Sequence, residues 1–139
     1  MQTIHEVMTR DPLTVDEGAP VSEAARVMRE ADIGDVVVTR PDGSVCGIVT
    51  DRDLALNVVA EGHDPASMVV RDVCNHTVES VESSDPVGKA VKMMSGRAIR
   101  RLPVIDDGRL VGIVTLGDLA MERDPGSALA SISEAPPNN

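Results

Sequence analysis

Two short segments carry the polar residues best placed to do chemistry in this sequence. Thr50 and Asp53 follow the apolar run Gly-Ile-Val, and Thr115 and Asp118 follow a second copy of the same run. A threonine with an acid three residues later is a capping box, which begins a helix and stabilises it by about 1 kcal/mol. A helix start at the end of a strand also presents free N–H groups to an anion, and an aspartate there can accept two hydrogen bonds from a ribose diol. The two interpretations are compatible, because the cap and a ligand can use different oxygens.

A second candidate is the group of Arg97, Arg100 and Arg101, the densest basic cluster in an acidic chain. Guanidinium groups suit phosphates because their paired donors match phosphate oxygens. The alternative is a solvated basic face at a strand entry that pairs with acidic residues across a dimer. Arg52, close to Thr50, is a further candidate for a phosphate contact.

The histidines and cysteines give no metal or catalytic constellation by spacing. His5, His63 and His76 lie in different segments and are expected on the surface or in loops. Cys46 lies in an apolar strand, where we expect it to be buried and inert. We expect Cys74 to be more exposed, but no basic neighbour argues for a reactive thiolate. We therefore predict no metal site and no catalytic residues.

Composition excludes several function classes. The formal charge of −10, from 23 acidic and 13 basic residues, disfavours binding to nucleic acid or anionic membranes. The chain has no Phe, Tyr or Trp, so it has no aromatic platform on which bases could stack. No apolar run approaches the roughly 20 residues of a membrane span. With no signal-like start and only two distant cysteines, the sequence is expected to be cytoplasmic.

The chain contains an internal repeat that positions the two polar segments. Shifting the sequence by 66 positions aligns its halves, with one deletion in a turn. Each copy has a short strand, a helix that begins at a proline, two strands separated by a turn, and a second helix, in the order β-α-β-β-α. The fold class is therefore mixed, α+β or α/β. We predict repeats at 1–58 and 70–122, a linker at 59–69 and a flexible tail at 123–139.

Two tandem copies that each end in Gly-Ile-Val-Thr-x-x-Asp resemble a cystathionine-β-synthase (CBS) domain pair. The likeness covers residues 4–122 and includes the Pro-Val helix start in both copies and the Leu-Pro-Val-Ile strand in the second. A single pair with no attached domain is similar to small stand-alone bacterial members of this family. The resemblance implies two packed repeats related by a pseudo-twofold axis, with clefts for adenosine-containing ligands between them.

The resemblance also implies a set of ligand contacts in each copy. Aspartate would hold the ribose hydroxyls, threonine or serine would contact ribose or phosphate, and the entry to the second strand would line the adenine. Carried onto this sequence, the ligand-binding residues are Thr14, Ile33, Gly34, Asp35, Val36, Thr50, Arg52, Asp53, Ser80, Ile99, Arg100, Arg101, Leu102, Pro103, Thr115 and Asp118.

The two clefts are not expected to be equal. Arg100 and Arg101 in the second copy align with Gly34 and Asp35 in the first, and the carboxylate of Asp35 would repel a phosphate. Likewise Gly117 replaces Arg52 in the second copy. We therefore predict one phosphate-competent site and one that is weak, empty or occupied by an uncharged ligand.

Three functions remain open from the sequence. The first, implied by the resemblance, is a non-enzymatic regulatory module that binds AMP, ADP, ATP, NAD or S-adenosylmethionine and forms a homodimer. It would need no other cofactor and would signal to an unknown protein effector in trans. The second is a ligand-free structural or stress-response interaction protein. The third, an enzyme, is disfavoured because no general base is paired with a nucleophile.

Overall fold

The computed structural model describes residues 2–97 and 99–123, which form two compact units. The first unit runs from Leu13 to Val78. The second unit combines the first twelve residues with those from Glu79 onward. Each unit has its own sheet and its own hydrophobic core.

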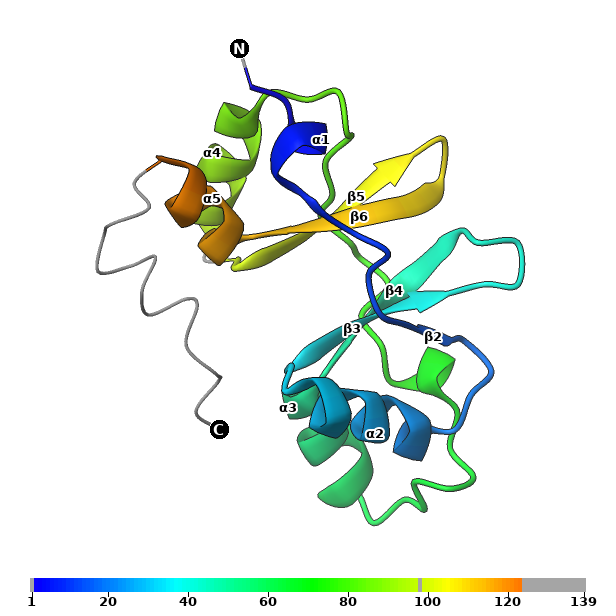
Figure 1. Cartoon of the computed structure of the whole chain (residues 1–139). Coiled ribbons are helices and arrows are strands. Elements are labelled where there is room, and N and C mark those ends of the chain that lie inside the picture. The colour runs from blue at the N-terminus through cyan, green and yellow to red at the C-terminus, as the bar shows by residue number, and fades with distance from the viewer. Residues whose placement is uncertain (1, 98, 124–139) are drawn as a thin grey trace. The chain divides into compact units, whose positions relative to one another are not determined.

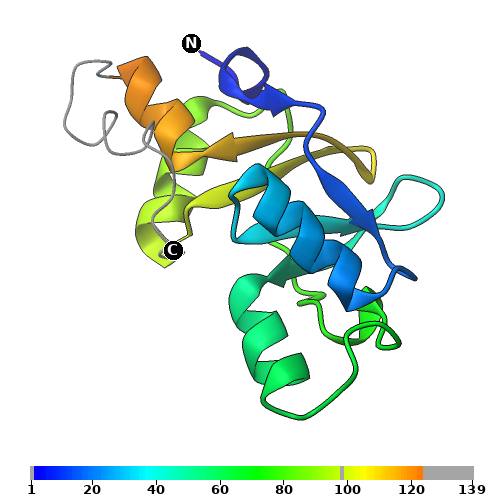
Figure 2. The ribbon, with the colours of Figure 1, turned by 60° about the horizontal axis from the view of Figure 1, so that its bottom comes forward.

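The first unit contains a three-stranded mixed sheet in the order β2-β3-β4. β2 runs parallel to β3, and β3 runs antiparallel to β4. Two neighbouring helical segments, α2 and α3 with its continuation η1, lie against this sheet (Figures 1 and 2). The elements are β2 (Thr14–Asp16), α2 (Val21–Ala31), β3 (Asp35–Thr39), β4 (Val45–Thr50), α3 (Asp51–Leu54), the π-helical η1 (Ala55–Val59) and the 3-10 helix η2 (Val70–Asp72).

The second unit repeats this plan with a sheet in the order β1-β6-β5. Both strand pairs are antiparallel, and the three helices gather beside the sheet (Figure 1). The elements are α1 (Ile4–Val7), β1 (Thr9–Arg10), α4 (Val87–Arg97), β5 (Arg101–Asp106), β6 (Arg109–Thr115) and α5 (Leu116–Arg123).

Helical spacing of apolar residues explains how α2 and α4 pack. Val21, Ala24 and Met28 form the buried face of α2, and Val87, Ala90 and Met94 form that of α4. Residues three and four apart lie on one face of a helix, so each set reaches its core together. Met28 and Met94 are accordingly buried in the two cores.

The predicted β-α-β-β-α order is confirmed in the first unit and is incomplete in the second. The short strand expected at the start of the second copy is reduced to an isolated parallel bridge between Val81 and Val104. Val81 N–H donates to the Pro103 carbonyl at 3.1 Å, and Ile105 N–H donates to the Val81 carbonyl at 2.8 Å. The next bond of a parallel ladder would need an N–H at Pro103, which proline lacks, so the pairing ends there.

In each unit the third strand is flanked by the leading segment of the other sequence repeat. Ile48 of β4 exchanges two backbone hydrogen bonds with Asn75, at 3.0 and 2.8 Å. In the same way β6 pairs with β1, with Thr9 opposite Ile113. The compact units therefore have boundaries different from those of the sequence repeats, because the leading segments are exchanged.

A glycine in each third strand permits this close approach. A Cβ at Gly47 would lie 2.4 Å from the Asn75 carbonyl oxygen, which no side chain allows. At Gly112 a Cβ would lie 2.7 Å from the Met8 sulfur and 2.9 Å from the Thr9 carbonyl oxygen. The glycine of the repeated Gly-Ile-Val run is thus required by the close packing of the neighbouring segment.

The predicted linker is attached to the first unit by backbone hydrogen bonds. η1 extends to Val59, and the carbonyls of Pro65 and Met68 accept the first N–H groups of α2 at 3.0 and 2.8 Å.

Of the predicted tail 123–139, Arg123 ends α5 and the remainder lies outside the described residues. Among the described residues, no helix has the length and apolar character needed to span a membrane.

Candidate functional site

In the first unit the capping box forms where β4 passes directly into α3. Asp53 N–H donates to Thr50 Oγ1 at 3.1 Å, and Thr50 N–H donates to Asp53 Oδ2 at 2.9 Å. Both side chains are half-buried. The predicted cap is confirmed, and it holds the Asp53 carboxylate at the carboxyl end of β4.

The second unit has nearly the same geometry at the junction of β6 and α5. Asp118 N–H donates to Thr115 Oγ1 at 3.0 Å, and Thr115 N–H donates to Asp118 Oδ2 at 3.0 Å. The Thr9 hydroxyl adds a long bond of 3.5 Å to the same oxygen, Oδ2. The leading segment exchanged into this unit therefore contributes to the surroundings of Asp118.

Each cap occupies only one oxygen of its aspartate. All hydrogen bonds to the Asp53 and Asp118 carboxylates from described residues reach Oδ2. Oδ1 of each aspartate accepts no hydrogen bond from the described residues. A carboxylate oxygen can accept two hydrogen bonds, so each cap leaves an acceptor available for a ligand hydroxyl.

The turn before the second strand is held against each cap by one backbone bond. Asp51 N–H donates to the Gly34 carbonyl at 2.9 Å, and Leu116 N–H donates to the Arg100 carbonyl at 2.9 Å. The structure therefore brings the predicted strand-entry residues beside the predicted Thr-x-x-Asp residues in both units. A Cβ at Gly34 would lie 3.0 Å from Asp51 Oδ2, so the first unit leaves little room for a side chain there.

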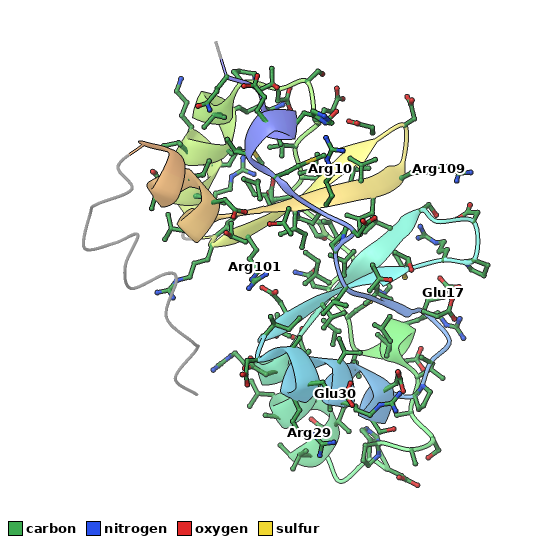
Figure 3. The ribbon with its side chains drawn as sticks, viewed as in Figure 1. Arg10, Glu17, Arg29, Glu30, Arg101 and Arg109 are labelled. Carbon is green, nitrogen blue, oxygen red and sulfur yellow. The ribbon has the colours of Figure 1, made fainter. Side chains whose placement is uncertain are left out.

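The three arginines of the second unit differ in their partners. Arg97 forms an ion pair with Glu79. Arg100 is exposed, and its guanidinium has no hydrogen bond or ion pair with the described residues. Arg101 begins β5, and Figure 3 shows its side chain extending away from the strands. Arg97 is thus already paired with an acidic residue of its own unit, whereas Arg100 is available to an anion.

The residues predicted to line adenine are divided between core and surface. The side chains of Val36, Leu102 and Pro103 are buried in the two cores. Ile33 and Ile99 are half-buried and pack at the edges of these cores. A ligand at these positions would therefore meet the isoleucine side chains and the backbone of the buried residues.

The remaining predicted contacts lie on the surface or close to it. Thr14, on β2, and Arg52, on α3, are exposed. Ser80 and Asp35 are half-buried, the latter at the start of β3. These positions are compatible with ligand contact, and their roles stay predictions.

Sequence spacing missed one cluster, formed by Cys46, Cys74 and His76 in the first unit. One ligand atom from each of the three lies within 4.8 Å of the others. Cys74 was expected to be more exposed than Cys46, but both are buried, because Cys74 packs in the core beside β4. Burial is the main cause that raises the pKa of the Cys74 thiol to about 11, and the nearby Cys46 thiol adds to the same shift.

The chain belongs to the CBS domain family, whose model matches residues 4–60 and 70–124. It is 36% identical to the CBS domain-containing protein YhcV of Bacillus subtilis, over 96% of both chains. It is 41% identical to the uncharacterized protein MK0525 of Methanopyrus kandleri over 84% of this chain, and it spans 60% of that relative's length. The predicted family is thereby confirmed.

Solved structures support the same fold. A crystal structure of hypoxic response protein I with two coordinated zinc ions is 32% identical, covers 88% of this chain and 99% of its own, and has a TM-score of 0.79. CBSX2 in complex with AMP has a TM-score of 0.77 at 24% identity, covering 88% and 96%. The CBS domain pair of MJ0100, in complex with methylthioadenosine and S-adenosylmethionine, has a TM-score of 0.77 at 23% identity, covering 91% and 99%.

Proposed function

We propose that this protein is a non-enzymatic regulatory module that binds an adenosine-containing ligand. The observation that carries the proposal is the pair of capping boxes, each of which holds an aspartate through Oδ2 and leaves Oδ1 without a partner among the described residues. A ribose diol presents two hydroxyl donors, which such an oxygen can accept. AMP and S-adenosylmethionine, bound by two proteins of the same fold, both carry this ribose.

The two units differ in the charge they offer to a phosphate. The second unit places Arg100 and Arg101 at the strand entry, while the first unit has Gly34 and Asp35 there, with Asp51 beside the glycine. A carboxylate beside the ligand raises the energy of a bound phosphate by charge repulsion, and a guanidinium there lowers it by attraction. The second unit therefore supplies the residues for a nucleotide, and the first suits an uncharged or cationic ligand better.

The signal would pass to a partner protein in trans, with the chain acting as a homodimer. The first unit offers a surface that a second copy could cover: a groove of about 490 Å³ between α2 and the α3–η1 helix. Val59 on its rim is 74% exposed, and Leu56 is exposed as well. Val59→Glu should lower the mass measured by light scattering from dimer to monomer. An unchanged mass would place the dimer contact elsewhere. We also propose a cytoplasmic setting, because a chain with only two cysteines shows no disulfide framework.

Thermal shift with AMP, ADP, ATP, NAD, S-adenosylmethionine and adenosine tests ligand binding. A ligand at one hundred times its Kd adds about 2.7 kcal/mol to the free energy of unfolding, which raises Tm by several degrees. Asp118→Asn keeps a carbonyl oxygen for the Thr115 N–H but replaces the other acceptor with a donor. Its Tm without ligand should match that of the wild type, while the ligand-induced rise should be smaller. Asp53→Asn makes the same test in the first unit.

The alternative function is a ligand-free structural or stress-response interaction protein. It would be supported if none of the six compounds changed Tm, or if both asparagine variants kept the full ligand-induced rise. Turnover of the nucleotides, followed by chromatography of the incubated ligand, would contradict the non-enzymatic proposal.

A further inference from the structure

The Cys46–Cys74–His76 cluster is built by two local features of the first unit. In the pairing of β3 with β4, Val38 lies opposite Gly47 and Thr39 opposite Val45, so Cys46 is the extra residue of a β-bulge. A bulge redirects a side chain that strict alternation would send to the other face. On the neighbouring segment, Asn75 is bridged to Ile48, and Cys74 and His76 on either side of Asn75 point to one face.

The distances within this cluster match those of a tetrahedral zinc site. His76 Nδ1 lies 3.7 Å from Cys46 Sγ and 3.9 Å from Cys74 Sγ. Zinc–sulfur bonds of about 2.3 Å and zinc–nitrogen bonds of about 2.0 Å at tetrahedral angles place sulfur and nitrogen about 3.6 Å apart. All three ligand atoms lie within 4.8 Å of one another, so small side-chain shifts can bring them around one metal ion.

Both ring nitrogens approach Cys74 Sγ, Nε2 at 3.7 Å and Nδ1 at 3.9 Å, but Nδ1 also lies 3.7 Å from Cys46 Sγ, which favours it as the ligand. His76 Nε2 lies 3.0 Å from the Arg71 carbonyl oxygen, and Nδ1 lies 3.2 Å from the Cys46 carbonyl oxygen. A neutral ring has one N–H, so it can donate to only one of these carbonyls. Donation from Nε2 to Arg71 leaves the Nδ1 lone pair facing the two sulfurs. Metal-bound histidines commonly have such a second hydrogen bond to a backbone carbonyl, which fixes the tautomer and the ring orientation.

Burial gives the cluster a dry side and an open side. Cys46 is 5% exposed and Cys74 is 8% exposed, whereas His76 lies at the surface. A metal ion can reach the sulfurs from the histidine side, where a water molecule can complete the coordination. Two sulfurs and one imidazole nitrogen are donors that select zinc over magnesium or calcium, which prefer oxygen.

We propose that Cys46, Cys74 and His76 bind one zinc ion in the first unit. Binding releases the two thiol protons to solvent, so that two thiolates neutralise the charge of the ion. The ion would join β4 to the leading segment of the second sequence repeat, two parts of the chain that otherwise meet through the Ile48–Asn75 bridge. This function is separate from ligand binding at the capping boxes, so either proposal can fail without the other.

The second unit serves as an internal control for this proposal. By the repeat alignment, Val111, Met8 and Arg10 occupy the positions of Cys46, Cys74 and His76. Val111 is the extra residue of a matching bulge, since Val104 lies opposite Gly112 and Ile105 opposite Leu110. Val111 and Met8 pack against the second core, and Arg10 instead reaches His5 Nε2 at 2.7 Å. The same backbone frame thus exists without a set of metal ligands.

Cobalt titration of the full chain, reduced and stripped of metal with a chelator, tests the proposal. One equivalent of Co²⁺ should produce visible absorption of a tetrahedral site with thiolate-to-cobalt charge transfer, and Zn²⁺ should displace it. His76→Gln, at an exposed position, should keep the fold and weaken cobalt binding at least tenfold. Cys74→Ala should remove most of the charge-transfer band. His63→Gln, which changes a histidine outside the cluster, should bind as the wild type does.

Zinc should also raise Tm in the wild type and in His63→Gln, with little effect on His76→Gln. Cobalt or zinc uptake that is unchanged in the His76 and Cys74 variants would overturn the proposal. So would reduced protein that takes up no metal at all. A Cys46–Cys74 disulfide in air, combined with no cobalt absorption after reduction, would identify a redox pair and would overturn it equally.

Discussion

The two units share one backbone plan but differ at the positions where chemistry is possible. Their capping boxes agree closely, with corresponding bonds of 2.9 and 3.0 Å and of 3.1 and 3.0 Å. Their strand entries differ in charge, with Asp35 in one unit and Arg101 at the equivalent position in the other. The features common to both units are thus those that we propose for binding a ribose. The features that differ would choose what is attached to it.

The two units also share a backbone but differ in side chains where the leading segments are exchanged. Both units need a glycine in the third strand and a bulged residue just before it. Only in the first unit does the bulged residue, Cys46, place a sulfur close to the Cys74 sulfur and the His76 imidazole. A repeated backbone frame has therefore been given different side chains at equivalent positions, and each difference can be tested against its counterpart.

The largest expected effect is on the two third-strand glycines. Gly47→Ala would press a methyl group against the Asn75 carbonyl at 2.4 Å, where the backbone must move. Gly112→Ala would first meet the Met8 sulfur at 2.7 Å, the flexible end of a side chain. Overpacking costs about 1–3 kcal/mol and occasionally more, so we expect Gly47→Ala at or above this range and Gly112→Ala within it. Urea unfolding measures both. Equal losses in the free energy of unfolding would contradict the idea that a clash with backbone costs more than a clash with a flexible side chain.

The next effect concerns recognition of phosphate. Replacing both Arg100 and Arg101 with alanine should remove the preference for AMP over adenosine. Hydrogen bonds to charged groups contribute about 1.5–3 kcal/mol, so the preference should fall roughly 10- to 100-fold. Calorimetry with the two ligands measures it. Arg97→Ala is the matched control, because Arg97 is already paired with Glu79 and should leave the preference unchanged. A preference retained in the double variant would rule out these arginines as the phosphate contacts.

Local sequence patterns predicted what depends on near neighbours in the chain. The two caps follow from Thr and Asp three residues apart, and the helices follow from the spacing of Val, Ala and Met. The full strand expected at the start of the second copy was wrong, because its pairing ends where Pro103, across the sheet, lacks an N–H. The thiol–imidazole cluster was missed because Cys46 and Cys74 are 28 positions apart and meet only through a bulge and an exchanged segment.

A smaller and nearly equal effect is expected at the two capping threonines. Thr50→Ala and Thr115→Ala each remove the hydroxyl that accepts the aspartate N–H. Loss of an N-cap costs about 1 kcal/mol, so each variant should lower the free energy of unfolding by that amount. Paired urea curves would show this. If Thr50→Ala lost more than twice the free energy of unfolding that Thr115→Ala loses, the first cap would stabilise further parts of its unit besides the helix that it begins.

The smallest effect contrasts the loops that follow β3 and β5. In the second unit Asp106 accepts hydrogen bonds from the Ser83 hydroxyl at 2.5 Å and from the Ser83 N–H at 2.9 Å. These bonds hold the pKa of Asp106 below its usual value, although partial burial opposes them. In the first unit, Arg40 and Glu17 at the equivalent positions form an ion pair at 3.7 Å instead.

A lowered pKa in the folded state stabilises the protein only while the carboxylate is ionised. The contribution of Asp106 is therefore complete above its unfolded pKa of about 3.9 and is lost as pH falls through the lower folded value. Ser83→Ala should reduce the free energy of unfolding at neutral pH, and the difference from wild type should shrink as pH falls below about 4. Glu17→Gln leaves this carboxylate untouched and serves as the control. A Ser83→Ala loss that is constant between neutral pH and pH 2 would show that the serine acts through packing, and that Asp106 does not couple stability to pH.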